Sequence, residues 1–256
     1  MDLALANKLT RPEGGKIVFC AIDGLGGLAR EETLRSELEK ADITHLDRLA
    51  ARSEVGLTEV AGPGLTPGPR IGLLALLGYD PLEYGPGAAI PAFSDTWKAR
   101  AVMLTHDETA AGVARSAGIE VLPGDGVQSQ IATVRIRLAD FDVFILHITA
   151  VAEAAFARDF PRKCHALSEF DAALPDLQSL GADVLAIGGP RSIPALLATP
   201  TWHPVPLLVS SVHGREGNAQ HFNEQECLRG SLGIMRAADV MPLLFAHALR
   251  LQPYGD

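Results

Sequence analysis

Residues 66–81 read Thr66-Pro67-Gly68-Pro69-Arg70-Ile71-Gly72-Leu73-Leu74-Ala75-Leu76-Leu77-Gly78-Tyr79-Asp80-Pro81. A proline- and glycine-rich segment here leads into an apolar run, and we expect a short helix over 71–77. Arg70 would then lie beside a helix N-terminus, where it could hold an anion. Pairing of Arg70 with an acidic neighbour on the surface is an equally good alternative.

The rest of the chain alternates apolar, β-branched segments with helical patterns. Near-continuous apolar strands separated by amphipathic helices are typical of an α/β fold, with a mostly parallel, doubly wound sheet and helices on both faces. The expected strands cover residues 16–22, 100–104, 119–122, 142–148, 183–187 and 205–210. The expected helices cover residues 31–40, 44–52, 71–77, 108–117, 162–180 and 238–249.

Ligands of such sheets bind at the carboxyl ends of the strands. This rule places Asp23, the residues after His147, and Gly188-Gly189-Pro190 along one edge of the expected sheet. These segments are therefore the first places to look for a functional site.

Composition narrows the class of protein. The 256 residues carry a formal charge of −9 and no block of Lys or Arg, which argues against nucleic-acid or anionic-membrane partners. Three scattered cysteines favour a reducing compartment over a disulfide framework or a thiolate zinc site. The most apolar window, residues 143–157, is too short to span a bilayer, and the first residues lack a leader pattern. We expect a soluble, cytoplasmic protein.

Several motifs, taken in order, resemble the archaeal-type cofactor-independent phosphoglycerate mutases of the alkaline-phosphatase-like superfamily. The end of the opening stretch, Leu74 to Pro81, is similar to the end of that family's nucleophile loop. Ile22-Asp23-Gly24-Leu25-Gly26 resembles the segment whose aspartate binds metal. Further similar segments occur at residues 43–50, 105–121, 203–208 and 222–244. The resemblance implies an alkaline-phosphatase-like core.

The same comparison implies that the family's chemistry is lost. Family members use a serine nucleophile and two divalent ions, such as manganese, magnesium or zinc, to neutralise the attacking and departing oxygens. Pro69 stands at the serine position, and of the matched ligand positions only Asp23 keeps a ligand. The other matched positions hold Arg70, Ala152, Phe156, Gly189, Pro190 and Pro200. We therefore expect no catalytic nucleophile and no metal cofactor.

The family also carries an inserted substrate-binding domain after Gly-Tyr-Asp-Pro. Here a shortened connection at about residues 84–98 takes its place, so residues 1–256 are expected to form a single core domain. The family's arginine-containing phosphate contact is replaced by Tyr84-Gly85-Pro86-Gly87. Phe93 and Trp97 in this connection would cover apolar surface or, alternatively, form a patch for a partner.

Each candidate residue also has an ordinary structural use. Asp23 could be a residual metal or phosphate ligand, but capping the next helix or holding its loop is the commoner use of such an aspartate. Residues 24–29 fit the dinucleotide pattern G-x-G-x-x-A, yet the second strand that the pattern requires does not follow soon enough. His147 could face the site or be a hydrogen-bonded core histidine.

Two other groups of residues are weaker candidates for a functional site. A replacement metal site could be built from His147, Glu153, Asp159 or His203, although their spacings match no helical ligand pair. Cys164 and His165 are adjacent in an expected helix and point to different sides, which disfavours a catalytic dyad.

Three functions remain open. The first is a degenerate mutase-like protein that binds a small anion or a protein partner, with residual site residues Asp23, Arg70 and His147. The second is an active metal-dependent phosphomutase or phosphatase rebuilt around one metal held near those same residues. The third is a scaffold or dimerisation subunit, which would make the chain a homo-oligomer.

Overall fold

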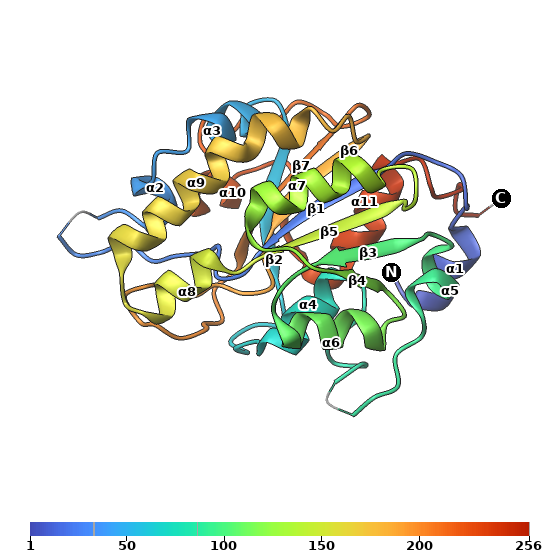
Figure 1. Cartoon of the computed structure of the whole chain (residues 1–256). Coiled ribbons are helices and arrows are strands. Elements are labelled where there is room, and N and C mark those ends of the chain that lie inside the picture. Colours follow the sequence, from blue (N-terminus) through green and yellow to red (C-terminus); the bar gives the residue numbers. More distant parts are fainter. Residues whose placement is uncertain (33, 86, 256) are drawn as a thin grey trace.

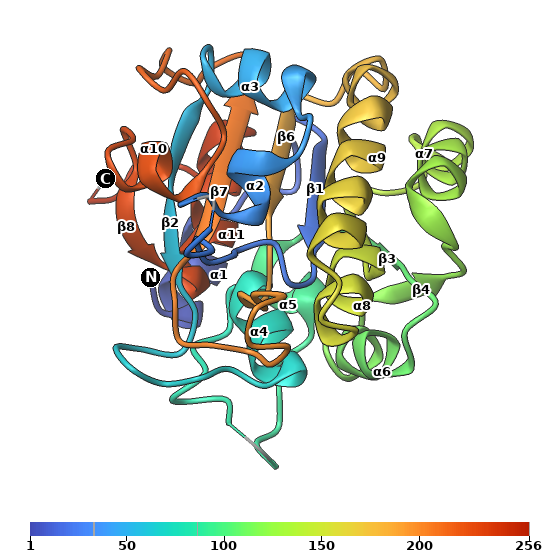
Figure 2. The same ribbon diagram turned by 90° about the vertical axis from the view of Figure 1, so that its left-hand side faces the viewer.

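The computed structural model describes residues 1–32, 34–85 and 87–255. An eight-stranded sheet forms the centre, with strand order β4-β3-β5-β1-β6-β7-β2-β8. Figure 2 shows β8 at one end of this sheet and β4 at the other. The strands are β1 (Ile17–Ile22), β2 (Glu54–Glu59), β3 (Ala101–Leu104), β4 (Glu120–Leu122), β5 (Val143–Ile148), β6 (Val184–Gly188), β7 (Val205–Ser211) and β8 (Gly233–Arg236).

The expected strands are all present, and their direction is nearly uniform. Every neighbouring pair is parallel except the two that involve β7. A parallel neighbour needs a long crossover, usually helical, and no helix lies between β6 and β7. The segment 189–204 instead turns back along the same edge, so β7 enters antiparallel. The sequence did not reveal β2 and β8, because glycine and charged residues interrupt their short apolar patterns.

Helices cover both faces of the sheet, as expected. Figure 1 shows α7 and α9 on one face and α4 and α6 on the other. The helices are α1 (Leu3–Leu9), α2 (Glu37–Lys40), α3 (Thr44–Ala50), α4 (Pro69–Leu76), α5 (Phe93–Trp97), α6 (Glu108–Ser116), α7 (Gly126–Arg137), α8 (Ala150–Phe156), α9 (Phe160–Gln178), α10 (Glu224–Leu228) and α11 (Val240–His247), with a 3-10 turn at Ala237–Asp239.

The helix expected over residues 31–40 is reduced to α2. Ser36 begins it through a capping box: its hydroxyl accepts from the Glu39 amide, and the Glu39 carboxylate accepts from the Ser36 amide. The capping box therefore fixes the helix start at Glu37. Thr33 of the expected helix lies outside the described residues.

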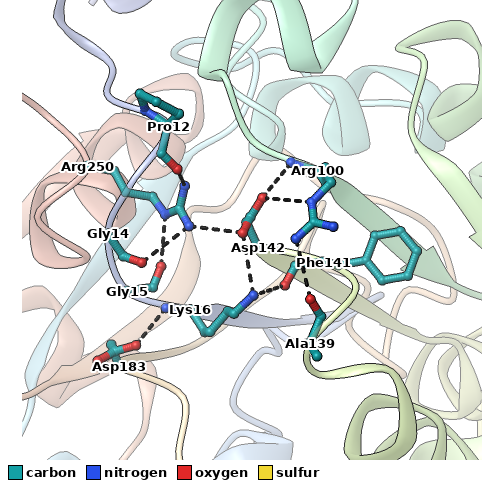
Figure 3. Close-up of polar contacts among 10 residues, drawn as sticks. All are labelled: Pro12, Gly14, Gly15, Lys16, Arg100, Ala139, Phe141, Asp142, Asp183 and Arg250. Carbon is teal, nitrogen blue, oxygen red and sulfur yellow. Dashed lines mark hydrogen bonds and ion pairs between the residues drawn. The ribbon is translucent and has the colours of Figure 1, made fainter.

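A charged cluster joins both ends of the chain to the amino edge of the sheet (Figure 3). Arg250 is 2% exposed and donates to the carbonyl oxygens of Pro12, Gly14 and Gly15. Its guanidinium also lies 3.1 Å from Asp142, just before β5, and Lys16 Nζ lies 3.4 Å from the same carboxylate. Each of these charges has partners, so the cluster has a structural role.

The connection between α4 and β3 contains α5 and packs tightly against the core. Trp97 and Phe93 are buried, and the ring of Phe245 in α11 lies 4.8 Å and 6.3 Å from theirs, centroid to centroid. The expectation that these two side chains cover apolar surface is therefore confirmed. Pro86, in the segment that replaces the family's arginine, lies outside the described residues.

Candidate functional site

The parallel strands bring the expected edge residues together. Ala21 of β1 is in register with His147 of β5 and with Gly188 of β6. Asp23 therefore follows the central strand, with the end of β5 on one side and the end of β6 on the other. This is the carboxyl edge, where sheets of this kind bind ligands.

Both carboxylate oxygens of Asp23 are occupied by one arginine. Arg191 Nε donates to Oδ1 at 2.8 Å, and its Nη2 donates to Oδ2 at 2.7 Å. Asp23 is 6% exposed and Arg191 is 7% exposed. A bidentate, charge-assisted pair in such surroundings is among the stronger polar contacts in proteins. Asp23 caps no helix among the described residues; it fixes the loop that follows β6.

Protein atoms also fill the space around this pair. Phe156 places its ring 5.6 Å from the Arg191 guanidinium carbon, in cation–π geometry. Ala152 packs with Ala155 and Ile193 in a small apolar cluster. Ala152 and Phe156 stand where the resemblance places a ligand aspartate and a ligand histidine. A methyl group and a phenyl ring now occupy those positions.

The segment that resembles the nucleophile loop forms the start of α4. Pro69 is the first residue of this helix, and Gly68 precedes it without a side-chain cap. A side chain at Gly72 would collide with the carbonyl of Pro190, so α4 packs directly on the Arg191 loop. Arg70 forms no ion pair or side-chain hydrogen bond with the described residues. Anion binding at the N-terminus of α4 and pairing with an acidic neighbour therefore both stay predictions.

A buried ion pair holds the loops that surround Asp23 and Arg191. Lys163 Nζ donates to the carbonyl oxygens of Gly26, at 3.0 Å, and Ile193, at 2.8 Å. It lies 3.3 Å from Glu37, whose carboxylate accepts from the amides of Leu28 and Ala195. Burial lowers the pKa of Lys163, and the Glu37 carboxylate opposes that shift. Lys163 and Glu37 thus tie the loop after β1 to the loop after β6.

Glu224 adds a second carboxylate to this network. It accepts from the Gly27 amide at 2.8 Å and from the Ser36 hydroxyl at 2.7 Å. Its burial raises its pKa, although both hydrogen bonds oppose the shift. A side chain at Gly26 or Gly27 would collide with Ser192 or Glu37. These glycines therefore serve close packing, and no helix of the dinucleotide pattern begins at them.

His147 is a buried histidine at the end of β5. Its Nδ1 lies 3.0 Å from the Thr105 hydroxyl, and its backbone carbonyl accepts from Gln130 Nε2 at 2.9 Å. Burial lowers the pKa of His147, and the nearby Asp23 carboxylate opposes that shift. Burial thus favours the uncharged form of this hydrogen-bonded ring.

The remaining candidates do not assemble into one site. Glu153 accepts from the Thr149 hydroxyl, whereas Asp159 accepts from the Arg162 amide and caps α9. His203 is stacked on Trp202. Cys164 donates to the Glu37 carbonyl, while its neighbour His165 lies 3.5 Å from Glu169.

Comparison with known proteins identifies the family. The Metalloenzyme superfamily model matches residues 15–247. The chain belongs to the Metalloenzyme superfamily. It is 33% identical, over 82% of its length, to a probable 2,3-bisphosphoglycerate-independent phosphoglycerate mutase of Deinococcus radiodurans. The match spans only 49% of that relative, so the chain corresponds to about half of it.

Solved structures show the same fold. The PH0037 protein of Pyrococcus horikoshii superposes with a TM-score of 0.87 and 20% identity, covering 95% of this chain and 99% of that chain. The cofactor-independent phosphoglycerate mutase of Thermoplasma acidophilum gives a TM-score of 0.73 and 14% identity, covering 91% of this chain and 100% of that one. Likeness at this level of identity concerns the fold alone.

The superfamily implies bound metal ions, and the residues of this chain do not fit them. Among the described residues, no three His, Cys, Asp or Glu side chains converge in a way that could hold an ion. Both carboxylate oxygens of Asp23 already accept from Arg191. A divalent ion beside Asp23 would also meet the positive guanidinium at close range.

Sequence reasoning missed Arg191, the residue that dominates this site. It directly follows the Gly188-Gly189-Pro190 segment, where the matched aspartate and histidine are absent. A new basic residue beside lost metal ligands is a signal that points to charge compensation. The pairing itself joins residues 168 positions apart, so no local pattern shows it.

Proposed function

We propose that this chain is a phosphoglycerate-mutase-like protein that has lost metal-dependent phosphoryl transfer and acts as a binding or regulatory protein. The observation that carries the proposal is the bidentate Asp23–Arg191 pair. Asp23 is the only matched metal-ligand position that keeps a ligand, and the pair places the Arg191 guanidinium against its carboxylate. The absence of a serine at position 69 supports the same conclusion.

Catalysis by this superfamily's chemistry needs a nucleophile and cations that stabilise charge as it develops. Pro69 has no hydroxyl, and the Arg191 charge is already neutralised by Asp23. The alanine and phenylalanine at positions 152 and 156 supply no ligand. With these substitutions the former centre has a structural role: it connects β1, β6, α4 and α8.

The competing proposal is an active phosphomutase or phosphatase rebuilt around one metal near Asp23, Arg70 and His147. Thr105 already occupies Nδ1 of the His147 ring, but the Arg70 side chain has no partner among the described residues. In that alternative, a metal ion has to share or displace the Arg191 guanidinium at Asp23.

The two proposals are separated by metal content and turnover of the whole chain. Protein purified without chelator is analysed for Mn, Zn and Mg by mass spectrometry and assayed for mutase and phosphatase activity, with a working mutase of the family as positive control. We expect substoichiometric metal and no turnover. Stoichiometric metal together with an activity that Asp23→Asn abolishes would establish the rebuilt enzyme instead.

Partners of this chain stay a matter of proposal. No helix among the described residues is long and apolar enough to cross a membrane. A binding role is compatible with a small ligand or with a protein partner, and self-association would show directly in the mass measured by light scattering.

A further inference from the structure

A cavity of about 540 Å³ opens at the carboxyl edge of the sheet, beside the Asp23–Arg191 pair: Ile148, which lines it, accepts a hydrogen bond from the Asp23 amide. Its wall combines the end of β5, the first turns of α7 and α8, and the middle of α9. Its volume is within the usual range of small-molecule sites. Neither Asp23 nor Arg191 lines it.

The topology of the sheet favours a ligand at this position. After β3 the chain passes to α6 on one face, and after β5 it passes to α8 and α9 on the face that carries α7 (Figure 1). Neighbouring strands whose connections leave toward opposite faces create a crevice, and open α/β sheets bind ligands there. The cavity includes His106, which follows β3, and residues 147–150, which follow β5.

Two buried polar side chains in the cavity wall have unused hydrogen-bonding capacity. Gln130 is 1% exposed, and its Nε2 donates to backbone carbonyls, but its Oε1 has no donor in the described part of the chain. His147 is 3% exposed and uses only Nδ1, toward Thr105. Buried polar atoms without partners are rare in native proteins and call for an explanation. Gln130 Oε1 is itself shielded from solvent, so the polar group of this wall that a ligand could meet is the His147 ring, whose Nε2 has no partner among the described residues.

The charges around the cavity define the kind of ligand. Its lining contains the carboxylates of Asp125, Glu153 and Glu169, the imidazoles of His106 and His147, and no Lys or Arg. His106 lies 3.9 Å from Glu153, and His165, outside the lining, lies 3.5 Å from Glu169. Burial lowers the pKa of His147, which favours its uncharged form. Such a wall attracts cations and repels phosphate or carboxylate groups. The lining thus disfavours the anionic substrates that a phosphoryl-transfer site would take.

The inner part of the same wall is apolar. Ile148, Ala166 and Phe170 are buried side chains that line it. An apolar wall with a few polar groups near the mouth is the usual design of a small-molecule site. A ligand body of aromatic or aliphatic carbon would pack against these three side chains.

We infer that this cavity binds a small organic cation, an amine with an apolar body, with the ammonium near Glu153 and Glu169 and the body against Phe170. The inference rests on the proposed function, because it assigns the site and ligand class of a chain that works by binding.

The test compares two probes of matched shape on the full-length protein. 2-Phenylethylamine is cationic, and 3-phenylpropionate is an anion of similar size. Binding is followed by amide chemical shifts in NMR titrations. We expect saturable shifts with the amine at residues 126–130, 147–150 and 166–172, and none there with the acid.

Variants locate the site. Glu153→Gln and Glu169→Gln, both at exposed positions, should each weaken amine binding by about threefold to fivefold, as expected for rim ion pairs. Ala150→Trp should fill the mouth and abolish saturable binding. Matched controls far from the cavity, Glu108→Gln in α6 and Ala4→Trp in α1, should leave the affinity unchanged.

Each outcome decides the inference. Equal binding of amine and acid, amine binding that survives Ala150→Trp, or no amine binding at all would overturn it. Any of these results leaves the proposed function standing, since that proposal fails only on stoichiometric metal and metal-dependent turnover.

Discussion

The guanidinium of Arg191 carries a permanent positive charge that balances the Asp23 carboxylate. Its N–H donors lie in one plane and match the two carboxylate oxygens. A metal ion in the same place would need ligands from several directions, and those positions now carry apolar side chains such as Ala152 and Phe156. Arginine stays charged at every pH at which the protein is folded, so the pair needs no ion from solution. At the level of single residues, Asp23 has a covalently attached cation as its partner.

Removing Arg191 should therefore be more damaging than removing the whole pair. We expect Arg191→Met to destabilise the protein by about 3–5 kcal/mol, because it leaves the buried Asp23 carboxylate without a partner. The double variant Asp23→Leu/Arg191→Met should recover a large part of that loss. Urea unfolding followed by circular dichroism measures both values.

Arg115→Met provides the matched control, because that arginine is paired with Glu108 on the exposed surface of α6. Its effect should stay within about 0.5 kcal/mol. If the losses from Asp23→Leu and Arg191→Met simply add in the double variant, the two side chains do not form the interaction described here.

The loops at the carboxyl edge depend on helices far from them in sequence. Lys163 in α9, Glu37 in α2 and Glu224 in α10 hold the segments after β1 and β6 through their backbone groups. These side chains provide hydrogen-bond partners for backbone groups of the two loops, which have no strand or helix hydrogen bonds there. Desolvation of the Glu224 carboxylate outweighs its hydrogen bonds and the nearby Lys163 charge, which leaves the ionised form unfavourable.

This imbalance gives a pH-dependent prediction for Glu224→Gln. The amide can still accept from Gly27 and can donate to Ser36, so the local contacts persist. The pKa of Glu224 is raised from 4.5 in the folded state, so its stabilising protonated form is lost as pH rises through the folded pKa. Relative to wild type, the variant should therefore become more stable as pH increases from 4.5 upward.

Urea midpoints measured across that pH range test this, with Glu226→Gln, on the same helix, as the control. A difference between Glu224→Gln and wild type that is constant with pH would show that Glu224 does not titrate as described.

At the scale of the whole molecule, the two edges of the sheet have different roles. The carboxyl edge holds the Arg191 pair and the cavity beside α7, while the amino edge joins the chain ends. Arg250 and Lys16 meet there at Asp142, and the amide and side chain of Arg100 also bind this carboxylate (Figure 3). Burial alone would raise the pKa of Asp142, but these partners lower it below its ordinary value.

Asp142→Asn should destabilise the whole fold by about 2–3 kcal/mol at neutral pH, because the carboxylate that pairs with three cations, two of them through hydrogen bonds, loses its charge. The sign of the pH effect follows from the lowered pKa: the contribution is present above 3.8 and disappears as pH falls through the folded pKa. Wild type and variant should therefore converge in stability in acid. Thermal unfolding at neutral and acidic pH measures this, and a gap that persists unchanged into acid would contradict it.

Sequence alone determined the class of fold, the strands that form its centre and the absence of a serine at position 69. These features reside in local residue types: apolar runs for β1 and β5, and a proline at position 69 that has no hydroxyl. It could not show that β7 is antiparallel, because that depends on how residues 189–204 return along the sheet.

The tertiary structure alone decided what became of the old centre and where a ligand could bind. Arg191 reaches Asp23, and α7 meets α9 beside β5, only because strands distant in sequence become neighbours in the sheet. Local propensities specify strands and helices, whereas ion pairs and cavities arise from the distances between them in space.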